Sequence, residues 1–174
     1  MAFDQNFAEA WLNNTHTVFG WKLKPFSIWH KLILKTIESP IMGEGEEQLS
    51  AVDIYSAAAI CRLEYPNQPQ PISRFTKFIN WIKLRPNKVI REVNNFTHYL
   101  EDYAATPEFW EKESESSSKG SGAPEELNTV VSLMLMGLSE KESWDCPIGK
   151  AAWYSGVSST WKGADISFLS AEEQ

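Results

Sequence analysis

Apolar side chains recur every three or four positions through most of the chain, which is the spacing of one face of an α-helix. This pattern predicts helices over residues 4–13, 27–38, 50–64, 73–84, 88–104, 124–136 and 147–160, and a short helix that opens at Ser139. The best candidate for a β-strand is segment 17–23, TVFGWKL. We therefore expect a mainly α fold.

Capping residues mark the start of several of these helices. Ser27 precedes the apolar residues of the helix predicted at 27–38. Ser50 is followed three positions later by Asp53, and Ser139 is followed three positions later by Glu142. A serine at such a position accepts a hydrogen bond from an N–H of the first turn, and the carboxylate three residues on binds back to the serine. The starts of these helices are thus specified locally.

One stretch of low complexity divides the chain. Residues 111–123, EKESESSSKGSGA, combine serine, glycine and charge. Such a segment buries too little apolar surface to offset the entropy lost on ordering, so we expect a flexible linker. It separates a helical domain at 1–110, expected to be a compact bundle of about five helices, from a small helical C-terminal segment at 124–174.

Spacing also predicts which side chains of the C-terminal segment face inward. In the helix at 124–136 these are Leu127, Val130, Val131 and Met134. In the helix at 147–160 they are Ile148, Ala151, Ala152 and Tyr154. Of the two cysteines, Cys61 lies in an apolar helical run and is expected to be buried, whereas Cys146, next to Pro147, has room to face solvent.

Composition and charge narrow the function classes. The chain has 174 residues, 43% of them apolar, and a formal net charge of −7. An acidic surface repels phosphate, so nucleic acid is not an expected partner. No run approaches the roughly 18 apolar residues of a membrane helix, and the N-terminus lacks the pattern of a signal peptide. We therefore expect no membrane association and a reducing cytoplasm as the location.

The sequence contains no pattern of reactive groups that is typical of an active site. The three histidines, His16, His30 and His98, are isolated, and the two cysteines lack metal or redox spacing. Gly149-Lys150 lacks the remaining residues of a phosphate-binding loop. We expect no catalytic residue, no cofactor and no metal, and we interpret the chain as a binding protein.

Large aromatic residues are the candidate anchors for binding. The chain holds eight tryptophans and nine phenylalanines, more than a core of this size requires. Trp and Tyr are the usual anchors of protein interfaces. The predicted protein-binding residues are Trp21, Phe26, Trp29, Trp81, Trp110, Trp144 and Trp153.

Two segments resemble phage tail proteins. The first, WKLKPFSIWHKLIL from Trp21 to Leu34, running on to Glu38-Ser39-Pro40, resembles a phrase that opens a helix in small proteins encoded near the tail genes of tailed phages. The second, LSEKESWDCPIGKA from Leu138 to Ala151, resembles a segment of tail assembly chaperones, with its proline one residue earlier.

The resemblance implies a function. Tail assembly chaperones are small, acidic, largely helical proteins that coat the apolar tape measure protein before the tail tube polymerises around it. Some occur as a short form and a frameshifted long form whose added tail recruits tube subunits, and the predicted organisation resembles the long form. The implied partners are the tape measure protein and the tail tube protein, in the host cytoplasm; a homo-oligomer is left open.

Two other interpretations stay open at this point. In the first, the chain is a structural virion protein, such as a connector or baseplate component. In the second, it is an enzyme or regulator whose site the sequence does not reveal. A DNA-binding regulator would use the basic segment 73–91, against which the acidity of the chain counts.

Overall fold

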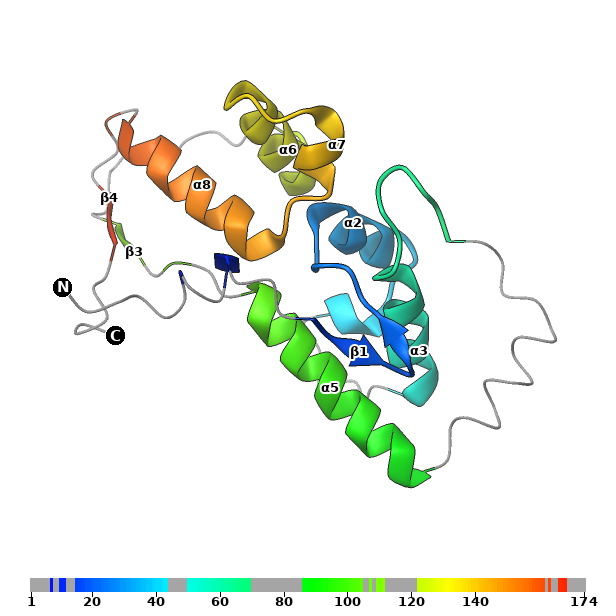
Figure 1. Ribbon diagram of the computed structural model, residues 1–174. Coiled ribbons are helices and arrows are strands. Elements are labelled where there is room, and N and C mark those ends of the chain that lie inside the picture. Colours follow the sequence, from blue (N-terminus) through cyan, green and yellow to red (C-terminus); the bar gives the residue numbers. More distant parts are fainter. Residues whose placement is uncertain are drawn as a thin grey trace.

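Helices dominate the computed structural model of the chain, shown in Figure 1, which confirms the mainly α fold. The structure describes residues 7, 10–11, 15–43, 50–69, 86–104, 107, 109–111, 122–161, 163 and 166–168. The predicted helix at 73–84 lies outside these residues, as does most of the predicted linker.

The N-terminal part joins a small hairpin to three helices. Its elements are β1 (Thr17–Val18), β2 (Trp21–Lys22), α2 (Ile28–Thr36), the 3-10 turn η1 (Pro40–Met42), α3 (Ala51–Ile60) and α5 (Pro86–Ala104). One apolar core unites them, and it includes Val18 of β1, Leu34 of α2, Ala57 of α3 and Tyr99 of α5. The Tyr99 hydroxyl donates to the Lys24 carbonyl at 2.8 Å, so the largest fully buried side chain among the described residues has its polar atom paired.

The prediction of one strand at 17–23 is wrong in one respect, because the segment forms two short strands, β1 and β2, in a tight antiparallel hairpin. Val18 pairs with Trp21, and Phe19-Gly20 form the turn. Both turn residues have positive φ, +51° at Phe19 and +77° at Gly20, and glycine adopts that region without steric cost. The Phe19 N–H donates to the buried carboxylate of Glu92 at 2.6 Å, which fastens the turn to α5.

Three predicted helix starts are confirmed. Ser27 caps α2 and Ser50 caps α3, where Asp53 completes the capping box. Ser139 and Glu142 form the same arrangement at α7. Helix α5 begins at Pro86 itself, because proline is tolerated in the first turn of a helix, where its missing N–H has no intrahelical partner.

The C-terminal part contains α6 (Glu125–Leu135), α7 (Glu140–Trp144) and α8 (Ile148–Trp161). Strand β4 (Ile166–Phe168) pairs antiparallel with β3 (Phe109–Glu111), a two-stranded sheet that the sequence pattern did not predict. In Figure 1, α6, α7 and α8 lie together on one side of α2, and α5 lies on the far side of the hairpin.

The inward face predicted for α6 is largely wrong. Its buried residues are Glu126, Val130 and Leu133, whereas the remaining predicted residues stay substantially exposed. The helix is apolar on two adjacent sides, so periodicity alone does not select the buried one. Pairing of Glu126 with Lys35 of α2 turns the Glu126 side toward the core.

Backbone and ionic contacts join the two parts. The Ile28 N–H donates to the Cys146 carbonyl at 3.2 Å, and the Ile148 N–H donates to the Phe26 carbonyl at 3.0 Å. Lys31 lies 3.1 Å from Glu125, and Lys35 pairs with Glu126. Helices α6 and α7 therefore pack on α2, whereas α8 packs on α6 and α5. The division into domains and a linker stays a prediction, because residues 112–121 lie outside the described ones.

No helix in the described part of the chain is long and apolar enough to cross a membrane.

Candidate functional site

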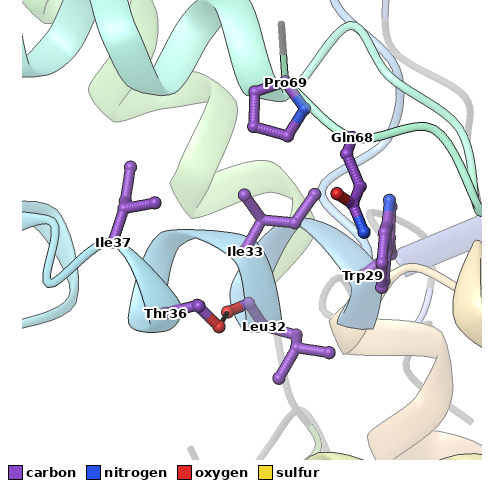
Figure 2. Close-up of a pocket in the computed structure, with 7 residues that line it drawn as sticks. All are labelled: Trp29, Leu32, Ile33, Thr36, Ile37, Gln68 and Pro69. Carbon is purple, nitrogen blue, oxygen red and sulfur yellow. Dashed lines mark hydrogen bonds between the residues drawn. The ribbon is translucent and has the colours of Figure 1, made fainter. Parts of the chain in front are cut away.

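An apolar groove runs along the outer face of α2. It has a volume of about 260 Å³ and lies between the helix and the segment that follows α3. Its lining residues are Trp29, Leu32, Ile33, Thr36, Ile37, Gln68 and Pro69. In Figure 2, Ile33 points from the helix toward Pro69, Trp29 and Gln68 close one end, and Ile37 stands at the other.

Two features of the sequence build this groove. The apolar stripe of α2 is wider than the core needs, so Ile33 is buried while Ile37 is 50% exposed. The indole N–H of Trp29 donates to the Asn67 carbonyl at 3.1 Å, which holds the opposite wall at a fixed distance from the helix. The Thr36 hydroxyl is turned back onto the Leu32 carbonyl at 2.8 Å, so its polar atom is already paired (Figure 2).

An aromatic cluster of Trp29, Tyr65 and Trp144 extends the groove onto α7. Tyr65 stacks on Trp144 with ring centroids 5.8 Å apart, and Trp29 meets both rings edge to face. The Tyr65 hydroxyl donates to Glu140 at 2.8 Å, and this hydrogen bond raises the pKa of the phenol. All three rings are partly exposed, so the cluster offers apolar faces from both parts of the chain.

The structure brings two of the predicted anchors together, Trp29 and Trp144. Trp21 lies apart from them, 4.6 Å from the Tyr55 ring and with the Arg62 guanidinium 4.8 Å from its own ring. The site's other members include Leu32, Ile37 and Tyr65. The first two belong to the stripe that predicted α2, whereas no sequence signal placed Tyr65 near Trp144.

Two further predicted anchors serve the interior. Phe26 is 4% exposed in the N-terminal core, and Trp153 is 8% exposed, with Phe7 packed against its ring at 5.3 Å. Their burial gives them packing roles in the fold, and partner contacts by these two residues stay a prediction. Trp81 lies outside the described residues, and Trp110 is described only as part of β3.

A second, polar cavity of about 230 Å³ lies beside the N-terminus of α2, and charged side chains line it. Lys24 lies 2.5 Å from Glu64, and Lys141 lies 3.4 Å from Glu64 and 2.5 Å from Asp145. Since each lysine already faces a carboxylate, this cavity presents no unbalanced charge to an anion. Its ion pairs connect the segment after α3 to α7.

His30 forms the inner wall of that cavity and is 2% exposed. The Ser27 N–H donates to Nδ1 at 3.1 Å, and Nε2 donates to the Leu63 carbonyl at 2.8 Å. Burial lowers the pKa of the imidazole below 6.5. The ring is therefore neutral, with the proton on Nε2, and both nitrogens are engaged in holding backbone.

The two thiols are buried and protonated. Burial raises the pKa of Cys61 to about 12 and that of Cys146 to about 11. The sequence left Cys146 room to face solvent, but the residue is only 5% exposed. It lies in the apolar cluster that joins Ile28 to the C-terminal helices. Among the described residues, no group of three or more His, Cys, Asp or Glu is arranged to hold a metal ion.

Comparison of the chain with protein-family models, with curated proteins and with solved structures found no match.

Proposed function

We propose that this chain is a non-enzymatic tail assembly chaperone of a tailed phage, which binds the tape measure protein in the host cytoplasm and helps recruit tail tube subunits. The observation that carries the proposal is the apolar groove of α2 with its aromatic cluster. A groove of this kind accepts the apolar side chains that an amphipathic helix presents at one face. The alternative is a structural virion protein.

The location of the resembling segments supports the proposal. The segment from Trp21 to Leu34 contributes Trp29, Leu32 and Ile33 to the groove, and the segment from Leu138 to Ala151 contributes Trp144 to the aromatic cluster. Although far apart in sequence, the two segments are joined by the hydrogen bonds that Ile28 and Ile148 donate across them. Residues carrying the resemblance therefore build one surface.

The net negative charge of the chain supports the proposed function as well. A protein that carries an apolar client must stay soluble while its own apolar surface is exposed, and a net charge of −7 opposes self-association.

A matched pair of substitutions tests the groove. Ile37 is 50% exposed at the groove, and Ile90 is 66% exposed on α5. We expect the wild type and Ile90→Gln to keep a co-expressed tape measure protein soluble and to co-purify with it. Ile37→Gln should weaken that complex roughly tenfold, because an apolar contact is lost from the groove. Equal binding by both variants would show that the groove does not hold the client.

A further inference from the structure

The wall of the groove opposite α2 has no regular secondary structure. It is formed by residues 63–69, which follow α3 and include Gln68 and Pro69 of the groove lining. Within it, the Asn67 N–H donates to the Glu64 carbonyl at 2.8 Å and closes one turn. A loop of this kind takes its position from contacts with the elements around it. We call residues 63–69 the groove wall.

Two side chains of α2 bind the groove wall near its ends. The His30 Nε2–H donates to the Leu63 carbonyl at 2.8 Å, and the Trp29 indole N–H donates to the Asn67 carbonyl at 3.1 Å. Both of these bonds come from α2. The middle of the groove wall, at Tyr65, is bound by α7 instead.

Asp145, at the C-terminal end of α7, binds the backbone of the groove wall. The Tyr65 N–H donates to its carboxylate at 2.8 Å, in a partly buried position. A carboxylate is unfavourable at the end of a helix, because the last carbonyls carry partial negative charge. The hydrogen bond from Tyr65 and the Lys141 ammonium, 2.5 Å away, offset this repulsion. Because Trp144 directly precedes Asp145, the same bond sets the Tyr65 ring against Trp144, on which it stacks.

The other contacts between α7 and the groove wall are weaker. Lys141 pairs with Glu64 at 3.4 Å, but the two side chains are 57% and 45% exposed, and exposed pairs contribute little. The bond from the Tyr65 hydroxyl to Glu140 is exposed as well. A backbone N–H bound to a carboxylate makes a stronger contact, and removing its acceptor leaves a partly buried donor unpaired.

We infer that Asp145 is a positioning residue of the groove, which holds Tyr65, and with it the groove wall, in place opposite α2. The residue after Asp145 is itself bound to α2, since the Cys146 carbonyl accepts the Ile28 N–H. The groove therefore takes its shape only when α7 is docked on α2. Client binding then depends on both parts of the chain, a consequence that rests on the proposed function, whereas the position of the groove wall does not.

Hydrogen exchange of the full chain, followed by NMR, tests this role. The probes are the Tyr65 amide and the Trp29 indole N–H. Asp145→Ser shortens the side chain so that its oxygen no longer reaches Tyr65, and we expect both probes to exchange roughly tenfold faster. Asp145→Asn keeps an oxygen acceptor at the same length, and Lys141→Met removes only exposed ion pairs, so both variants should exchange at rates close to the wild type.

The Leu34 amide, in the core, serves as an internal control and should keep its wild-type exchange rate in each variant. Four results would overturn the inference: an unprotected Tyr65 amide in the wild type, no change in Asp145→Ser, the same acceleration in Asp145→Asn, or equal acceleration at Leu34. The first of these needs no variant, so the test stands even where a substitution prevents folding.

The consequence for client binding is measured separately. Asp145→Ser should weaken the complex with co-expressed tape measure protein roughly tenfold, as Ile37→Gln does. An undiminished complex would overturn the dependence of the client site on α7. Absence of any complex with the wild type would contradict the proposed function, and the exchange rates would still decide the role of Asp145.

Discussion

Replacing Lys35 with methionine removes the cation that pairs with Glu126 across the α2–α6 contact. The Glu126 side chain is 6% exposed and that of Lys35 is 43% exposed. Removing the partner of a fully buried charge costs about 3–5 kcal/mol, whereas an exposed pair contributes about 0–1 kcal/mol. Because Lys35 is half-exposed and Lys31 remains 3.9 Å from Glu126, we expect Lys35→Met to lower the free energy of unfolding by about 1–2 kcal/mol.

A double-mutant cycle isolates the pair. Lys35→Met, Glu126→Gln and the double variant are unfolded in urea at pH 7, and we expect a coupling energy of about 1 kcal/mol. Val52→Gln serves as the control, since Val52 is exposed on α3 and distant in sequence from both partners. A coupling energy within error of zero would refute the conclusion that this ion pair orients α6.

The pH dependence of the coupling has a definite sign. Burial raises the pKa of Glu126, but the hydrogen bonds from Lys35 and from its own backbone N–H, together with the charges of Lys35 and Lys31, outweigh it and leave the pKa below 4.5. A carboxylate with a lowered pKa in the folded state stabilises the protein above its unfolded pKa. The coupling should therefore be full at pH 7 and should disappear as the pH falls below 4.5 through the folded pKa.

Three further predictions follow from other parts of the fold. The neutral His30 stabilises the fold above pH 6.5, and this contribution declines as the pH falls toward the lowered folded pKa of the imidazole. His30→Gln should remove this part of the pH dependence of the free energy of unfolding, measured in urea. An unchanged pH profile would contradict the prediction. Cys61 and Cys146 should resist a thiol reagent at pH 8 until urea unfolds the chain, and rapid labelling of the native protein would contradict their burial. Gly137→Ala should lower the melting temperature through a loss of about 1–2 kcal/mol, because Gly137 has φ +100° and alanine is strained there; an unchanged melting temperature would argue against the Schellman ending of α6.

Local chemistry explains what the sequence predicted well. The starts of α2, α3 and α7 follow from Ser27, Ser50 and Ser139, whose hydrogen bonds lie within one helical turn. The apolar spacing that predicted the helix at 27–38 includes both Ile33, which is buried in the core, and Ile37, which is exposed at the groove, but it did not predict this difference.

Features formed by distant segments were predicted poorly. The second wall of the groove depends on the hydrogen bond from Trp29 to Asn67, and the aromatic cluster depends on α7 reaching Tyr65. The wrong face of α6 has the same origin, since the pairing of Glu126 with Lys35 decides which of two apolar sides is buried. The sequence around Glu126 does not indicate that Lys35 is its partner, and the sequence around Lys35 does not indicate Glu126.

Mass spectrometry of infected cells and of purified particles decides between the proposed chaperone and a structural virion protein. The chain should be recovered with the tape measure protein from cell lysates before tails are complete, and it should be missing from purified mature particles. Recovery of the chain at a fixed copy number in mature particles would contradict the chaperone function.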